Sequence, residues 1–314
     1  MRITNLMMTN NAIQNMADNL EKVSNLQSKI ASNKQFQVPS DDPLRASTSL
    51  NLRSQLQTLE SYADTAALSE NWMTASDNAF DQLEQIAIRA NDLILSGLND
   101  TLSGSERAQT LGAEMQELIA ETVEIGNTSV NGQYIFSGYQ VNQKAFSLTD
   151  AAAPLLDYAG NPFTPKVANY LGDTGVMQRS LGPDQSVALN VRGDQAILGF
   201  LQNLIVASNA LIQNNVHNTS DPLTLEASLG NLKTSIDTLD QYRTSNGARL
   251  RQVTSASNFL ESVKLETESL LSENEDINLA ESIALLANQQ NTYEAVLEVS
   301  QRAISALSLF DYLR

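Results

Sequence analysis

The sequence predicts a mainly α-helical protein whose two chain ends pair with each other, with a small β-rich segment inserted between them. Half of the 14 glycines and four of the seven prolines lie between Gly132 and Gly193. Both flanking regions are poor in these residues and place apolar side chains at spacings of three and four, the pattern of long helices. Aromatic residues make up only 5% of the chain, so any core must consist mainly of aliphatic side chains.

The N-terminal flank contains a heptad-like row of apolar residues, with Gln27 at the one position where the row is polar. A helix from Ala12 to Ser32 would be about 30 Å long, and an exposed apolar row on so long a helix requires a partner. The row consists of Ile13, Met16, Leu20, Val23 and Ile30.

The C-terminal flank repeats this spacing and supplies the candidate partner, with Gln290 and Ser300 at polar positions of the row. Residues 1–34 hold four bases and two acids, whereas residues 271–314 hold seven acids and two bases, which favours their pairing. The C-terminal row consists of Ile283, Leu286, Tyr293, Leu297, Ile304 and Leu307. Because both rows contain polar residues, we expect the isolated pair to be marginally stable and to become ordered when neighbouring subunits cover it. We call the two rows together the assembly seam.

Helix starts are readable between the two ends. Asp42 before Pro43 and Asp221 before Pro222 each predict an N-cap followed by proline in the first turn. Capping boxes are predicted at Ser103 and at Ser272. The expected inner helices are Pro43–Ser96, Gly104–Val130, Asp194–Asn214 and Pro222–Leu271, with a break near Gly247 as an open alternative. The helix-start loop consists of Pro39, Ser40, Asp41, Asp42 and Pro43.

These patterns predict a division of the chain into an inner terminal-helix domain, a helical bundle and an outer insert. The terminal-helix domain is formed from residues 1–42 and 272–314, and the bundle from residues 43–140 and 193–271. The β-rich outer domain spans residues 141–192. Short runs such as Tyr134–Phe136 and Ser186–Val191 are expected to form strands of the β-rich region.

Composition argues against several classes of function. The formal charge of −17, with no cluster of basic residues, disfavours nucleic-acid binding. The chain has no cysteine, which removes disulfides and thiol chemistry. Residues 1–19 lack the apolar run of a cleavable signal, and no segment is apolar enough for membrane insertion, so an external location would require another export route.

The sequence predicts no catalytic, cofactor-binding or metal-binding residues. The single histidine, His217, lies in a polar loop without an evident catalytic partner. Asp41–Asp42 and Asn274–Asp276 offer oxygen atoms to a divalent cation, but helix capping is the simpler interpretation because neither has the spacing of a calcium loop.

Two separated motifs resemble signatures of the bacterial flagellin family, and the resemblance covers about residues 1–146 and 243–314. The first is LQSKIASNK at Leu26–Lys34, followed by VPSDDP at Val38–Pro43. The second is ENEDINLAE at Glu273–Glu281, followed by NQQNTYEA at Asn288–Ala295. The resemblance implies a flagellin-like elongated helical bundle with paired terminal helices.

Within this family the chain is more similar to hook-filament junction proteins than to filament flagellins. The features that favour the junction type are MRIT at Met1–Thr4, PSDDP at Pro39–Pro43, NGQYIFSGY at Asn131–Tyr139 and LSLFDYL at Leu307–Leu313. The resemblance implies a non-enzymatic structural subunit that is exported unfolded by the flagellar type III apparatus, so that it is transiently cytoplasmic and finally extracellular.

The partners that the resemblance implies are a hook-side junction protein, flagellin, further copies of the chain in a ring, and a cytoplasmic export chaperone that covers the C-terminal row. The alternatives are a filament flagellin of the same fold, a cytoplasmic coiled-coil regulator and a secreted enzyme. A filament flagellin would be distinguished by its bulk abundance in the filament. A cytoplasmic regulator would be absent from the culture medium, and a secreted enzyme would bind or turn over a small ligand.

Overall fold

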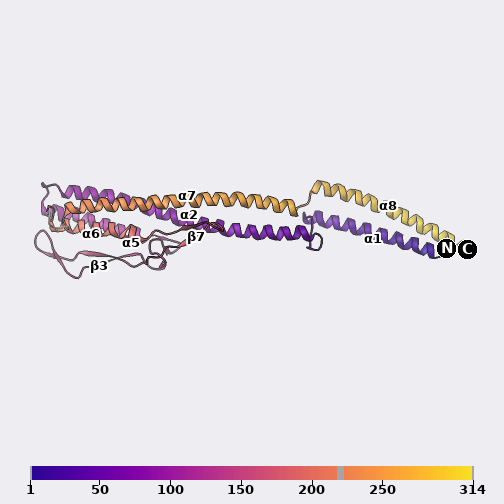
Figure 1. The fold of residues 1–314 in the computed structure, drawn as a ribbon, viewed down its shortest axis with the longest axis horizontal. Coiled ribbons are helices and arrows are strands. Elements are labelled where there is room, and N and C mark those ends of the chain that lie inside the picture. Colours follow the sequence, from indigo (N-terminus) through magenta and orange to yellow (C-terminus); the bar gives the residue numbers. More distant parts are fainter. Residues whose placement is uncertain (1, 218–222, 313–314) are drawn as a thin grey trace. The chain divides into compact units, whose positions relative to one another are not determined.

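A computed structural model describes residues 2–217 and 223–312 of the chain (Figure 1). The chain forms two compact units. The terminal unit comprises Met1–Leu59 and Ser262–Arg314, and the central unit comprises Glu60–Glu261. The mainly helical fold with a small β-rich middle region, predicted from the sequence, is confirmed.

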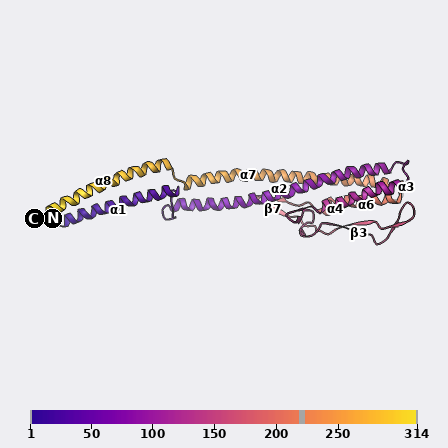
Figure 2. The same cartoon turned by 180° about the vertical axis from the view of Figure 1, so that it is seen from behind.

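The terminal unit is built from four helical pieces. Helix α1 (Arg2–Ser32) and helix α8 (Leu279–Tyr312) run antiparallel and side by side, so that the start of α1 lies beside the end of α8 (Figures 1 and 2). The first turns of α2 (Pro43–Gly97) and the last turns of α7 (Leu225–Glu275) complete this unit. Among its described side chains, Val23 and Ala46 are the only buried apolar ones, so the terminal unit has almost no core of its own.

The helix starts agree only in part with the expected caps. The Asp42 Oδ1 atom accepts a hydrogen bond from the Arg45 amide at 3.0 Å, and Ser103 forms the predicted capping box with Glu106. The capping box predicted at Ser272 is wrong, because α7 continues past Ser272 to Glu275. At the start of α8, the Asn278 side chain instead accepts a hydrogen bond from the Glu281 amide.

Two further expectations concern α7. The expected cap at Asp221–Pro222 lies outside the described residues, and α7 begins at Leu225, where the Thr224 hydroxyl accepts from the Ala227 amide at 3.1 Å. The helix runs without interruption through Gly247, so the alternative of a break there is wrong. Among the described helices, none combines the length and apolar character needed to cross a membrane.

The central unit holds the hydrophobic core. Every residue of its main cluster lies between Ala66 and Ala256, and Trp72 and Met73 are buried within it, as expected for ordinary core residues. The expected helix Gly104–Val130 contains a π-helical segment and ends four residues early, and the expected helix Asp194–Asn214 is divided at Ile197. The helical pieces beside α2 and α7 are α3 (Gly104–Glu106), η1 (Arg107–Gly112), α4 (Ala113–Gly126), α5 (Gly193–Ala196) and α6 (Leu198–Gln213).

The β-rich region consists of four two-stranded antiparallel ladders. The longest pairs β3 with β6, in the register Phe146 opposite Tyr170 through Asp150 opposite Lys166. The rings of Phe136 and Phe80 meet edge to face at 5.6 Å, which joins this region to helix α2 inside the central unit. The strands are β1 (Ser129–Val130), β2 (Gln133–Tyr134), β3 (Phe146–Asp150), β4 (Leu155–Leu156), β5 (Pro162–Phe163), β6 (Lys166–Tyr170), β7 (Gln178–Ser180) and β8 (Ser186–Ala188).

Candidate assembly site

The terminal helix pair meets along two rows of side chains with alternating spacings of four and three. Each of these side chains is buried or half-buried, and we call them the pairing rows. On α1 they are Ala12, Met16, Asn19, Val23, Leu26 and Ile30, and on α8 they are Ser282, Leu286, Gln289, Tyr293, Val296 and Ser300. Such spacing is that of a two-helix coiled coil, although half of the α8 positions are polar.

At several sites, the pairing rows contain the residue next to the one that was predicted for the assembly seam. Met16, Val23, Ile30, Leu286 and Tyr293 belong to both sets, and Leu297, beside Val296, is half-buried. Ile13, Leu20 and Ile283 are instead 50%, 51% and 51% exposed. Their side chains point away from the partner helix because smaller or polar neighbours, such as Ala12 and Asn19, occupy the contact. The side chains of Ile304 and Leu307 lie outside the described residues.

A polar contact lies within the pairing rows. The Gln289 side-chain amide donates a hydrogen bond to the Asn19 Oδ1 atom at 2.8 Å, and both side chains are half-buried. Sequence reasoning missed both residues, because it followed the more apolar of two overlapping heptad frames. The second frame, which runs through Ala12, Asn19 and Leu26, is visible in the sequence as another row with the same spacing.

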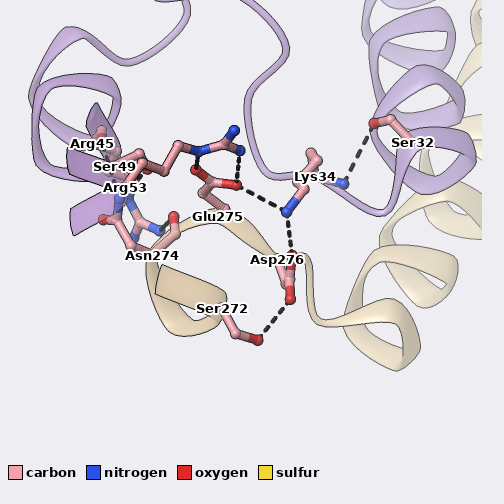
Figure 3. A network of polar contacts seen from close by, with 9 residues as sticks. All are labelled: Ser32, Lys34, Arg45, Ser49, Arg53, Ser272, Asn274, Glu275 and Asp276. Atoms are coloured by element: carbon pink, nitrogen blue, oxygen red, sulfur yellow. Dashed lines mark hydrogen bonds and ion pairs between the residues drawn. The ribbon is translucent and has the colours of Figure 1, made fainter. Parts of the chain in front are cut away.

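A cluster of charged side chains, which we call the charge cluster, lies at the base of the terminal helix pair, where α1 and α7 end (Figure 3). Lys34, which follows α1, places its Nζ atom 2.9 Å from Glu275 Oε2 and 2.8 Å from Asp276 Oδ1. Arg53 of α2 reaches the same Glu275 carboxylate with two hydrogen bonds, of 2.9 Å from Nε and 2.7 Å from Nη2. Three chain segments far apart in the sequence are thereby joined through one carboxylate.

Hydrogen bonds from uncharged donors support the charge cluster. The Asn274 side-chain amide donates to the Arg45 carbonyl oxygen at 2.9 Å and to the Ser49 hydroxyl at 2.8 Å (Figure 3). The Ser272 hydroxyl donates to Asp276 Oδ2 at 2.6 Å. The two bonds from Asn274 attach the last turn of α7 to the first turns of α2, whereas the Ser272 bond orients Asp276 at the end of α7.

Backbone hydrogen bonds connect the chain after α1 to the chain after α7. The Gln35 amide donates to the Glu275 carbonyl at 2.7 Å, and the Ile277 amide donates to the Asn33 carbonyl at 3.3 Å. Asn33 ends α1 in the left-handed conformation with φ of 53°, which asparagine tolerates at helix ends. The two flagellin-like motifs identified in the sequence therefore meet in space at this point.

Burial and charge act in opposite directions on Glu275. Its side chain is only 5% exposed, which by itself disfavours the ionised form. The hydrogen bonds from Arg53, followed in importance by those from Lys34 and Ser49, outweigh burial and lower the pKa of Glu275 to about 2. The same contacts, first with Asp276 and then with Glu275, raise the pKa of Lys34. The cluster is thus fully ionised near neutral pH.

The helix-start loop is organised by its two aspartates. The Asp41 Oδ2 atom accepts hydrogen bonds from the Gln37 amide at 3.1 Å and the Val38 amide at 3.3 Å, which lower the pKa of Asp41. Asp42 caps α2. Pro39 and Ser40 form the exposed turn between Val38 and Asp41, and Pro43 is the first residue of α2.

The carboxylates considered for metal binding already have partners. Asp41 and Asp42 accept from backbone amides, and Glu275 and Asp276 face Lys34. In the described part of the chain, no three histidine, cysteine, aspartate or glutamate side chains are grouped so as to hold a metal ion.

His217 is half exposed in the central unit. Its Nε2 atom lies 3.3 Å from Asp100 Oδ1 and its Nδ1 atom lies 3.5 Å from Glu226 Oε2. Both carboxylates are more exposed than the imidazole, at 86% and 61%, so the group lies at the surface.

The N-terminal part of the chain is similar to bacterial flagellins. The model of the bacterial flagellin N-terminal helical region matches residues 3–141. Escherichia coli flagellar hook-associated protein 3 is 25% identical over 179 residues, which are 56% of this chain and 50% of that protein. Residues 3–141 are therefore similar to the N-terminal helical region of flagellins, and the alignments cover about half the length of the curated relatives that the chain matches.

Solved structures of hook-associated proteins share the fold. A candidate flagellar hook-associated protein from Vibrio parahaemolyticus superimposes with a TM-score of 0.62 at 15% identity, over 75% of this chain and all of that one. FlgL from Bacillus cereus gives a TM-score of 0.56 at 20% identity, over 71% of this chain and 99% of its own. Together with the sequence matches, these confirm the predicted resemblance to the flagellin family, and in particular to flagellar hook-associated protein 3.

Proposed function

We propose that this chain is a structural subunit of the bacterial flagellum that joins the hook to the filament. The supporting relatives are hook-associated proteins 3 in particular, which favours the junction role over that of a bulk filament flagellin. In this role the chain is not an enzyme. It lies outside the cell, between a hook-side junction protein and flagellin, in a ring of its own copies.

The observation that carries the proposal is the exposed apolar surface of a terminal unit that has almost no core. Leu20 and Ile283 are half exposed on paired helices, although such a stripe is costly to leave in water. Covering apolar surface is worth roughly 25 cal/mol per Å². Copies of the chain, or of its flagellar partners, that pack on this stripe would complete the missing core.

The same features suit export. A terminal unit with few buried apolar residues can remain unfolded while it passes the flagellar type III apparatus and become ordered at the growing tip. Before export, a cytoplasmic chaperone would cover the apolar side chains of the C-terminal helix, from Ile283 to Leu307.

Deletion of the gene tests the proposal. A strain without the chain should assemble hooks but no filaments, and it should release flagellin monomers into the medium because the filament has no junction on which to grow. If the chain were the filament flagellin itself, no flagellin would accumulate in the medium. Normal filaments in the deletion strain would contradict both roles.

Complementation separates the assembly surface from folding. Plasmid-borne wild-type chain should restore filaments, whereas Leu20→Asp should be exported and yet fail to restore them. A matched change at an exposed polar position of the same helix, Gln27→Asp, should restore them at least in part.

A further inference from the structure

The hydrogen bond between Asn19 and Gln289 crosses the pairing rows where apolar contact would be more stabilising. Its neighbours along α1 are Met16 and Val23, and its neighbours along α8 are Leu286 and Tyr293. A pair of amides at such a position lowers the stability of a coiled coil but makes one alignment of the two helices preferable to others.

We infer that the Asn19–Gln289 contact selects the register in which α1 pairs with α8. Antiparallel helices with a heptad spacing can slide by seven residues and still match apolar rows. If α8 slid by seven residues along α1 in one direction, Asn19 would face Val296 and Gln289 would face Leu26. Both half-buried amides would then lose their partner. If α8 slid by seven residues in the other direction, Gln289 would face the methyl group of Ala12.

The remaining contacts of the pairing rows discriminate poorly between these alignments. The buried serines Ser282 and Ser300 are small and fit opposite most side chains. Each slide also brings apolar residues opposite apolar residues. A half-buried amide that loses its hydrogen-bond partner is costly, so the Asn19–Gln289 contact should favour the observed register by about tenfold or more.

The charge cluster at the base is the competing source of register. Lys34 and Glu275 also hold the two segments together, but Lys34 lies in the non-helical chain after α1 and Glu275 is the last residue of α7, so neither belongs to the pairing rows. Asn19 is 15 residues from Lys34 along the chain, which corresponds to about 22 Å of helix. The two sources therefore act at different places and can be removed separately.

Cysteine cross-linking of the full chain measures the register, since the natural sequence has no cysteine. Val23 and Leu286 each lie one helical turn from the amide pair and on the same side of it, so Val23→Cys with Leu286→Cys reports the observed register. Val23→Cys with Tyr293→Cys reports the register slid by seven residues. The ratio of the two cross-linking yields, after a brief oxidation, is the measured quantity.

In the wild-type background the observed register should dominate by about tenfold or more, and in Asn19→Leu with Gln289→Leu the ratio should approach one. The exchanged pair, Asn19→Gln with Gln289→Asn, should keep most of the preference because both amides remain. Gln27→Leu with Gln290→Leu makes the same chemical change at exposed positions and should leave the ratio unchanged.

Glu275→Gln decides between the two sources of register. If this variant abolishes the preference while the double leucine variant retains it, the charge cluster sets the register and the inference is overturned. Equal yields for both cysteine pairs in the wild-type background would overturn it as well.

Discussion

At the scale of single residues, Glu275 is the group on which the base of the terminal helix pair depends. It is buried and accepts hydrogen bonds from Lys34 and Arg53, which belong to two other segments. Removing one partner of a buried ion pair leaves the others without compensation, and this costs more than an exposed pair is worth. Because the Arg53 side chain is 60% exposed, water can solvate its guanidinium group when the carboxylate is removed, and this offsets part of the lost interaction energy.

Glu275→Gln should weaken the attachment of the terminal helices by about 2 kcal/mol, because the neutral amide cannot satisfy two cations. Hydrogen exchange of α1 and α8 amides in the full chain should show the loss, with the central unit unchanged. Glu273→Gln, which makes the same change at the exposed neighbouring position, is the control and should have no effect.

The pH dependence follows from the lowered pKa of Glu275. Its pKa is about 2 when the cluster is formed and 4.5 when it is not, so between these values the unpaired state binds more protons. The stabilisation is therefore complete above about pH 4.5 and is lost progressively as the pH falls towards 2. Hydrogen-exchange protection of α8 should fall in this window. Protection that is constant between pH 5 and 3 would show that Glu275 contributes little.

At the scale of elements, the two terminal helices divide their apolar residues between each other and the outside. Val23 is buried against the partner helix, whereas Leu20, one turn earlier, is half exposed. Sequence periodicity finds the helices but does not tell which of two adjacent stripes faces the partner, because both have heptad spacing. The charged contacts to Glu275 were missed for a different reason: its partners are more than 200 residues away in the chain, and one sequence holds no local sign of them.

Aspartate substitutions separate the two stripes. Val23→Asp should disrupt the pairing of α1 with α8, because it buries a charge between the helices. Leu20→Asp should leave the pair and the central unit intact but abolish incorporation into the flagellum, because Leu20 faces outward. Leu297→Asp, at a half-buried position, should also abolish incorporation. Hydrogen exchange measures the pairing and swimming assays measure incorporation; normal motility of both leucine variants would remove this surface from the assembly.

At the scale of the whole molecule, the two units are stabilised by different contacts because the hydrophobic core lies in the central unit. Among the described residues, the buried apolar cluster lies between residues 66 and 256, whereas the terminal unit combines the mostly half-buried pairing rows with polar and ionic contacts. The sequence predicted the helical flanks and the β-rich middle correctly because the glycine and proline distribution separates them. The domain limits at residues 42 and 272 remain a prediction; the compact units of the structure comprise residues 1–59 with 262–314 and residues 60–261.

Limited proteolysis of dilute monomer should remove the terminal segments first, about 35 to 45 residues from each end. The physical reason is that a pair with a polar contact row opens more readily than the core-containing central unit. A protease of broad specificity, with the fragments identified by mass spectrometry, gives the order of cleavage. Termini that resist cleavage as long as the central unit does would contradict ordering on assembly.

Immunogold electron microscopy of intact flagella tests the proposed junction role most directly, with antibody raised against residues 141–192. A junction protein should give a narrow band of label where the hook meets the filament. Label along the whole filament would contradict it and make the chain a flagellin, and the absence of label from flagella would contradict a flagellar role altogether.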